Sequence, residues 1–132
     1  QTKLVCVSKG TGDVEWENPE KILSPGFFKF PLAATVGLKD EVKLFNREGN
    51  VEVWKNEELR YRDLSKPIIW DDAVWTIDSF GVLHGLSIVD GNTVSRYNLN
   101  RKSDIVSFIG TQFGLLVTDV DGHTILLKKR EH

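Results

Sequence analysis

Short segments of alternating apolar and polar residues, separated by turn dipeptides, recur along this chain. Asp90-Gly91 and Asp121-Gly122 each separate two such segments. Alternation with a period of two is typical of a half-buried strand, and Asp-Gly between two alternating runs indicates a hairpin. A further hairpin is expected where 51–55 runs through Asn56-Glu57 into 59–62. The chain is therefore constrained to build sheets from antiparallel strands that follow one another in sequence.

Composition supports strands over helices. The 132 residues include three alanines, against 14 valines, 8 isoleucines and 8 threonines. β-Branched side chains fit a pleated surface and lose rotamer freedom in a helix. The formal net charge of −2 excludes a strongly basic nucleic-acid arm. We expect one all-β domain over residues 1–132, standing alone or within a longer chain, because this length suits a single core.

Four segments can be aligned on a turn glycine, which suggests an internal repeat. The aligned glycines are Gly12, Gly49, Gly81 and Gly114. Two residues further on stand Val14, Val51, Leu83 and Leu116. Residues two apart share a face of a strand, so we predict that these apolar side chains occupy equivalent buried places. The predicted repeat units are approximately 3–40, 41–72, 73–103 and 104–132.

Two stretches resemble the strands of a β-propeller blade. One is 73–83 followed by 89–92, and the other is 105–116 followed by Asp121-Gly122. The resemblance implies a propeller-like fold, but the spacing of about 33 residues leaves room for three strands rather than the usual four. Three architectures therefore stay open: a propeller-like arc, a compact barrel or two-sheet sandwich, and a subunit that completes its sheet with a second chain. An open arc exposes strand edges, which favours self-association.

The sequence contains no arrangement of residues that predicts catalysis. His84, His123 and His132 lack the spacing of metal ligands, and no cysteine pair accompanies them. The Asp119-Val120-Asp121 turn starts like a calcium loop but lacks its later ligands. The lone Cys6 stands in an apolar strand-like run and is expected to be a small buried hydrophobe. We predict no catalytic residue, no metal site and no cofactor.

Aromatic residues are the strongest candidates for binding. Trp54 alternates with Val51 and Val53, so we expect it on the outer face of its strand with Arg60 and Arg62 as a polar rim. Exposed aromatic and arginine side chains are typical anchors of protein partners. A second group consists of Trp70 with the adjoining Asp71 and Asp72. The predicted binding residues are Trp54, Arg60, Arg62, Trp70, Asp71 and Asp72.

These observations favour a non-catalytic binding or assembly module that recognises protein. The first alternative is a carbohydrate or small-ligand domain that uses the tryptophans, and the second is a hydrolytic enzyme that uses Asp71, Asp72 and His84. Lys128-Lys129-Arg130 is too small a basic patch to predict nucleic-acid binding. We expect a protein partner or self-association and no membrane contact. The absence of a disulfide favours a soluble, cytoplasmic protein over a secreted one.

Overall fold

The computed structural model describes residues 2–22, 26–29, 31–46, 51–99 and 105–128. These residues form thirteen strands and no helix, which confirms the predicted all-β fold. The hairpins expected at Asp90-Gly91 and Asp121-Gly122 are present, with Gly91 and Gly122 at φ +77 and +84. The hairpin expected from 51–55 into 59–62 is not formed, since 57–67 is an irregular connection.

The strands make four antiparallel sheets, within which pairing runs between strands consecutive in sequence. The first sheet contains β1 (Thr2–Val7) and β2 (Val14–Ile22). The second contains β3 (Phe27–Lys29), β4 (Leu32–Val36), β5 (Val42–Asn46) and β6 (Val51–Asn56). The third contains β7 (Ile68–Trp70), β8 (Ala73–Ile77), β9 (Val82–Ser87) and β10 (Thr93–Asn98). The fourth contains β11 (Ile105–Thr111), β12 (Gly114–Asp119) and β13 (Thr124–Leu127).

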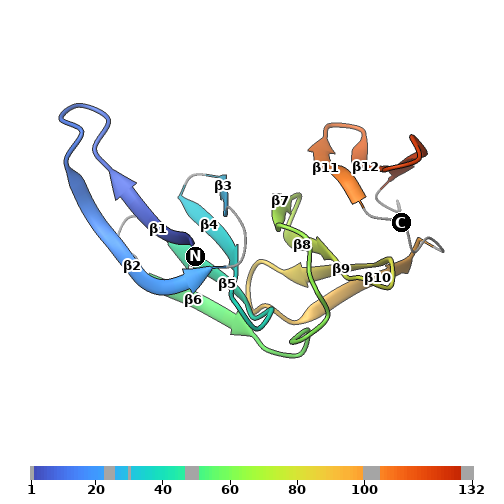
Figure 1. Ribbon diagram of the computed structural model, residues 1–132, viewed down its shortest axis with the longest axis horizontal. Helices are drawn as coiled ribbons and strands as arrows, with labels where there is room; N and C mark the ends of the chain where they lie inside the picture. The colour runs from blue at the N-terminus through green and yellow to red at the C-terminus, as the bar shows by residue number, and fades with distance from the viewer. Residues whose placement is uncertain (1, 23–25, 30, 47–50, 100–104, 129–132) are drawn as a thin grey trace.

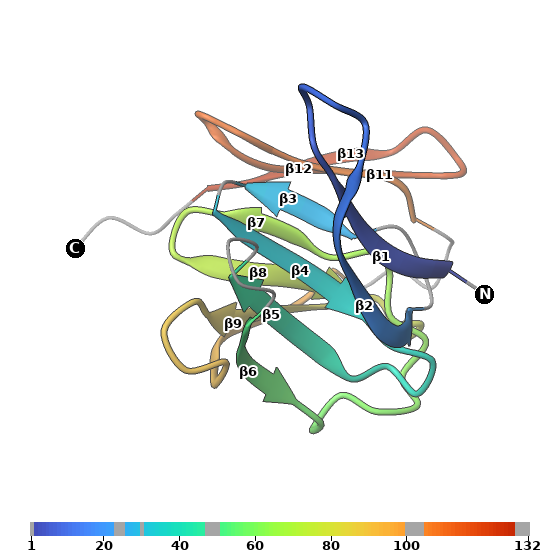
Figure 2. The same ribbon diagram turned by 90° about the vertical axis from the view of Figure 1, so that its left-hand side faces the viewer.

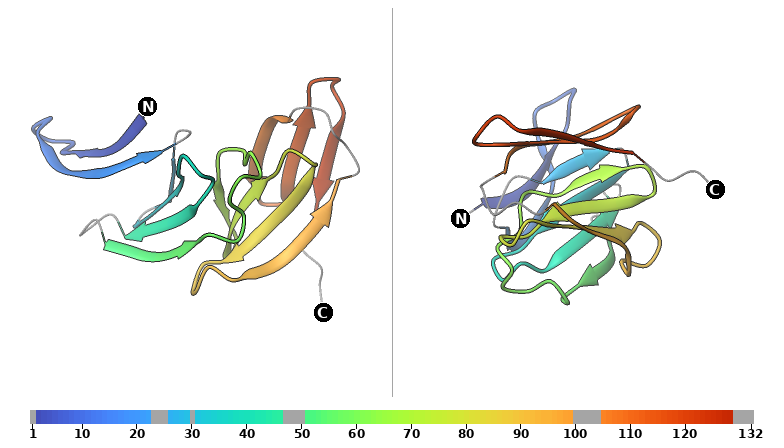
Figure 3. Two further views of the ribbon diagram at one scale, coloured as in Figure 1. Left: turned by 60° about the horizontal axis from the view of Figure 1, so that its bottom comes forward. Right: turned by 90° about the vertical axis from the view of Figure 1, so that its right-hand side faces the viewer.

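The four sheets follow one another along an open arc. Figure 1 shows β1 and β2 at one end and the sheet of β11 to β13 at the other, and the left view of Figure 3 shows the same order. Figure 2, which looks along the arc, shows the sheets one behind another. The first strands of the last three sheets lie side by side, because β7 contacts both β3 and β11. The arrangement is propeller-like, and it is not a closed barrel.

Two hydrophobic cores hold neighbouring sheets together. The first core lies between the second and third sheets and is closed by Leu59 and Leu64 of the 57–67 connection. The second core lies between the third and fourth sheets. Ile68 and Ile69 are adjacent in β7 and enter different cores, since successive strand residues point to opposite faces. The third sheet is therefore covered on both sides.

The outward face of the fourth sheet carries a row of apolar side chains across its three strands. Ile109 pairs with Leu116, and Leu116 pairs with Leu126. Ile109 and Leu126 are 47% and 43% exposed. In the third sheet, the paired apolar residues Ile77 of β8 and Leu83 of β9 lie in the second core.

The prediction that Trp54 faces outward is wrong. Its side chain is 7% exposed, and its indole nitrogen donates a hydrogen bond to the carbonyl of Ile88 in the next sheet. Val51 and Val53 are the exposed apolar residues of β6, at 59% and 44%. The alternation was identified correctly, but a period of two does not say which side of a strand faces the core.

The predicted alignment on glycines is also wrong in register. Val14 and Val51 are more than half exposed, whereas Leu83 is 2% exposed, so these positions do not share a buried face. The boundaries at 40/41 and 72/73 fall inside the second and third sheets. Turn glycines mark hairpins of every kind, so they do not identify the place of a hairpin in its sheet. Gly49 lies outside the described residues. The two four-stranded sheets begin roughly forty residues apart, at Phe27 and Ile68, as four strands require.

Candidate functional site

Three loops bring exposed apolar and cationic side chains together at one end of the second and third sheets. Leu38 is in the β4–β5 turn, Tyr61 in the 57–67 connection, and Phe80 in the β8–β9 turn. These side chains are 47%, 72% and 65% exposed. We call this set, with its neighbouring cations, the loop surface; its residues are Leu38, Lys39, Arg60, Tyr61, Arg62 and Phe80.

Backbone hydrogen bonds fix the three loops to one another. The amide of Tyr61 donates to the carbonyl of Lys39 over 3.2 Å, and the amide of Ser79 donates to the carbonyl of Arg62 over 3.0 Å. The connection therefore lies between the two turns and bonds to both. Loops joined in this way present their side chains in a fixed arrangement.

Asp40 anchors the connection from the side of the second sheet. Its buried carboxylate accepts hydrogen bonds from the amides of Asp63 and Leu64, both over 3.1 Å. Asp40, Tyr61 and Asp63 all have positive φ, at 63, 64 and 53. This region is tolerated by aspartate but unusual for a bulky tyrosine. The hydrogen bonds and the buried Leu59 and Leu64 hold the backbone in this conformation.

Asp78 anchors the connection from the side of the third sheet. One carboxylate oxygen accepts hydrogen bonds from the amides of Phe80 and Val82, and the other lies 2.8 Å from Nε2 of His84. Arg62 reaches the same carboxylate, with 3.6 Å between nitrogen and oxygen. Burial is the largest influence and opposes ionisation, but the hydrogen bonds from His84, Val82 and Phe80 together lower the pKa of Asp78 below its ordinary value.

The structure places the six predicted binding residues in three different settings. Arg60 and Arg62 belong to the loop surface. Trp54 lies in the first core, and Trp70 packs between the third and fourth sheets with its indole nitrogen bonded to the carbonyl of Thr111 over 2.8 Å. Both tryptophans therefore serve to join sheets. Lys129, Arg130 and the side chain of Cys6 lie outside the described residues.

Asp71 and Asp72 form the turn between β7 and β8, with Asp71 at φ +54. His84 is fully buried on β9, where it pairs with Thr76 of β8. Thr76 stands three residues along β8 from Ala73, so about 10 Å of strand separates His84 from the turn that carries the two aspartates. The structure therefore does not assemble the three residues that the hydrolase alternative needs. His84 is bonded to Asp78 instead.

The β12–β13 turn, whose Asp119-Val120-Asp121 segment resembles the start of a calcium loop, contains a group of two aspartates and a histidine. One ligand atom from each of Asp119, Asp121 and His123 can lie within 4.8 Å of the others. Asp119 accepts hydrogen bonds from the amides of Asp121 and His123, both over 2.9 Å. Burial is the largest influence on the pKa of Asp119 and acts to raise it. The hydrogen bonds from His123 and Asp121, together with the charge interaction with His123, lower the pKa below its ordinary value. The carboxylate thus stabilises its own turn.

Leu38, Tyr61 and Phe80 were not predicted from the sequence. The available signal was a large apolar residue within a polar turn segment, as in Arg-Tyr-Arg at 60–62 and Ser-Phe-Gly at 79–81. Such a residue has no place in the alternating pattern of a strand.

A helix of the length and apolar character needed to cross a membrane does not occur among the residues described here.

No protein-family model matches the sequence. The chain is 25% identical to the outer membrane protein assembly factor BamB of Francisella tularensis, over 96% of this chain and 29% of the relative. It is 32% identical to BamB of Marinobacter adhaerens over 73% of this chain and 25% of the relative. With BamB of Escherichia coli it shares 21% identity over 90% of this chain and 30% of the relative. The chain spans about a quarter to a third of the length of these curated relatives.

Solved structures show the same fold. The crystal structure of BamB from Moraxella catarrhalis matches 98% of this chain with a TM-score of 0.85 and 22% identity, and the match covers 39% of that protein. The computationally designed Ika4 protein matches 96% of this chain with a TM-score of 0.79 and 12% identity, over 79% of its own length. These neighbours confirm the predicted β-propeller-type resemblance.

The relatives also test the predicted function and location. A non-catalytic, protein-binding assembly module is the predicted class, and the relatives are named as assembly factors, which agrees with the assembly role in that prediction. The cytoplasmic location is wrong, because these relatives are named for the assembly of outer membrane proteins. A chain with a single cysteine cannot form an internal disulfide in any compartment. The absence of a disulfide therefore could not distinguish a cytoplasmic protein from one outside the cytoplasm.

Proposed function

We propose that this chain is a docking module for outer membrane protein assembly, and that it binds a protein partner through the loop surface. Seven curated relatives named BamB support the biological setting. The single observation that supports the binding site is the exposure of Leu38, Tyr61 and Phe80 on loops bonded to one another. The partner is a component of the assembly machinery.

The composition of the loop surface suits a protein interface. Tyrosine, phenylalanine and arginine are enriched at such interfaces and dominate the residues whose removal costs most affinity. Arg60 is held near Glu57, with 3.8 Å between nitrogen and oxygen, and Arg62 near Asp78. The cations are thus oriented before a partner arrives. An interface that is already ordered loses less conformational entropy on binding.

Site-specific photo-crosslinking in cells tests this proposal. A photoreactive phenylalanine analogue is placed at Phe80 or, as the matched control, at Val94 of β10, which is 63% exposed. We expect a specific adduct with a component of the outer membrane assembly machinery at Phe80 and none at Val94. Adducts of equal yield at both positions, or none with that machinery, would contradict the proposal.

A functional readout complements the crosslink. A cell that lacks the native protein is supplied with the full-length protein carrying Tyr61→Ser and Phe80→Ser together, and outer membrane protein levels are measured. We expect the double variant to restore less than the unchanged protein, while Val94→Ser restores as much. Full restoration by the double variant would count against the loop surface.

A further inference from the structure

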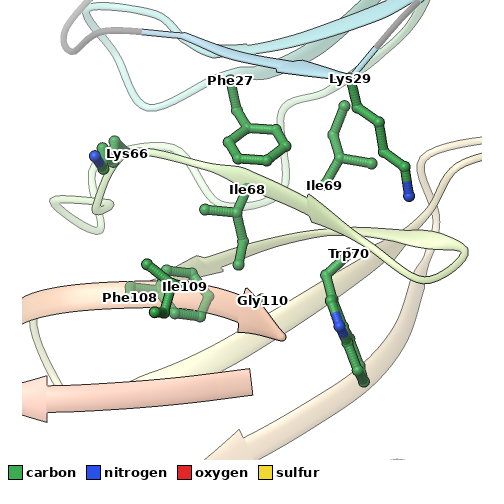
Figure 4. A pocket seen from close by; sticks show the side chains of 9 residues that line it. All are labelled: Phe27, Lys29, Lys66, Ile68, Ile69, Trp70, Phe108, Ile109 and Gly110. Carbon is green, nitrogen blue, oxygen red and sulfur yellow. The ribbon is translucent and has the colours of Figure 1, made fainter. Parts of the chain in front are cut away.

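The first strands of the last three sheets line a groove that is separate from the loop surface. The groove has a volume of about 400 Å³ and is formed by β3, β7 and β11. Figure 4 shows Phe27 and Lys29 on β3, Ile68 and Trp70 on β7, and Ile109 on β11 around the same space. It lies where three different sheets meet.

The floor of this groove is apolar and rigid. Ile68 and Phe108 belong to the second core and are 2% and 4% exposed, while Ile109 is 47% exposed. Trp70 fixes β7 against β11 through its hydrogen bond to the carbonyl of Thr111. A side chain added at Gly110 would collide with the Trp70 ring, so the two strands approach as closely as glycine permits. The groove is therefore preformed.

Two ammonium groups flank the apolar floor, and the lining residues include no carboxylate. Figure 4 shows Lys66 toward one end of the groove and Lys29 toward the other. Both side chains are exposed, and in the part of the chain that the structure describes neither has an ion-pair partner. A ligand that complements this arrangement has an apolar centre and negative charge on both sides.

We propose that the groove binds an extended polypeptide segment in which apolar residues are flanked by acidic residues. The choice of a polypeptide rests on the proposed function, whereas the charge pattern comes from Lys29, Lys66 and the floor between them. An apolar side chain of the segment occupies the space above Ile68 and Ile109. Flanking carboxylates reach the two ammonium groups. Binding is sensitive to salt because both lysines are exposed.

Three synthetic peptides test the proposal by fluorescence anisotropy with the full chain. Each has a Leu-Phe-Leu centre, flanked on both sides by two glutamates, two serines or two lysines. We expect the glutamate peptide to bind about tenfold more tightly than the serine peptide, and the lysine peptide to bind least. Equal affinity for all three would overturn the proposal.

Charge reversal identifies the site. The double variant Lys29→Glu with Lys66→Glu is expected to lose the preference for the glutamate peptide and to favour the lysine peptide. The matched control is Lys9→Glu with Lys128→Glu, at exposed lysines outside both the groove and the loop surface, which should keep the original order. If the control pair abolishes the preference as fully as the groove pair, the groove is not the site.

The loop-surface variant separates this result from the proposed function. Tyr61→Ser with Phe80→Ser should leave peptide affinity unchanged, since neither residue lines the groove. If the unchanged chain gives no crosslink from position 80 but keeps its peptide selectivity, the docking role alone is refuted. Intact crosslinking with no peptide selectivity would refute the groove alone.

Discussion

The carboxylate of Asp78 and the imidazole of His84 lie 2.8 Å apart, and both side chains are fully buried. Asp78 directly follows the last residue of β8 and His84 lies on β9, so the contact closes the β8–β9 turn from inside the sheet. The same carboxylate accepts a hydrogen bond from the backbone amide of Phe80 in the turn and lies near Arg62 of the loop surface. One buried pair thereby links a sheet to the proposed binding face.

His84→Ala is expected to destabilise the chain by about 2 kcal/mol, because it removes a hydrogen-bond partner from a buried carboxylate. The measurement is the free energy of unfolding in urea. His123→Ala is the matched control, since His123 also faces an aspartate but its side chain is 56% exposed. We expect the control to change stability by less than about 0.5 kcal/mol. Similar losses in both variants would show that burial of the pair contributes little.

Stability should fall in acid partly through Asp78. A carboxyl group whose pKa is lower in the folded chain contributes stability above its unfolded pKa, near 4, and loses it as pH falls through the folded value. We expect unfolding free energies measured between about pH 5 and pH 2 to decline less steeply in Asp78→Asn than in the unchanged chain. An unaltered slope would mean that other carboxyl groups account for the acid sensitivity.

Gly91→Ala should be more costly than Gly122→Ala. Both glycines have positive φ, so both variants carry the same kind of backbone strain. A Cβ at Gly91 would lie 2.5 Å from the Trp54 ring, whereas nothing lies within 4 Å of one at Gly122. We expect an additional loss of about 1–3 kcal/mol for Gly91→Ala in chemical denaturation, as for overpacking elsewhere. Equal losses would show that the Trp54 ring can move aside.

Tyr61→Asn should separate binding from stability. Asparagine tolerates the left-handed backbone of this position but lacks the aromatic ring. We expect the unfolding free energy to stay within about 1 kcal/mol, while the crosslink at Phe80 weakens. Tyr97→Asn, at a 51% exposed tyrosine of β10, is the control and should leave the crosslink intact. A variant that crosslinks normally would remove Tyr61 from the proposed interface.

Self-association remains a prediction, and the row of Ile109, Leu116 and Leu126 suggests where to test it. Light scattering at rising concentration should show a dimer or larger species, because the row is apolar and its outer members Ile109 and Leu126 are exposed. Leu126→Glu should shift the chain toward the monomer, and Val94→Glu on β10 should not. A monomer at high concentration in the unchanged chain would contradict the prediction.

The sequence predicted local structure better than the relation between distant elements. Asp-Gly turns and alternating residues located the last hairpins, since both signals are set by neighbours in sequence. Which side of β6 is buried depends on the third sheet, which supplies Ile88 and Gly91 to Trp54. The alternation of Trp54 with Val51 and Val53 could not contain that information.

The candidate site shows the same division. Arg60 and Arg62 were identified from the sequence, but for a wrong reason: they were expected to surround an exposed Trp54. Tyr61 and Phe80 were missed because their exposure depends on the 57–67 connection docking between two turns. That docking is set by Asp40, which stands 23 and 24 residues before Asp63 and Leu64, and by Asp78, which stands 16 residues after Arg62. Long-range hydrogen bonds of this kind leave no periodic trace.

The position of Asp78 has a consequence for how this face could change over time. The arrangement of the loop surface depends on buried hydrogen bonds, so a substitution at His84 in β9 would change that surface although His84 is not part of it. Conversely, the exposed rings can be exchanged while the scaffold beneath them keeps its shape. Recognition can therefore drift quickly at three side chains, provided that the two buried aspartates stay where they are.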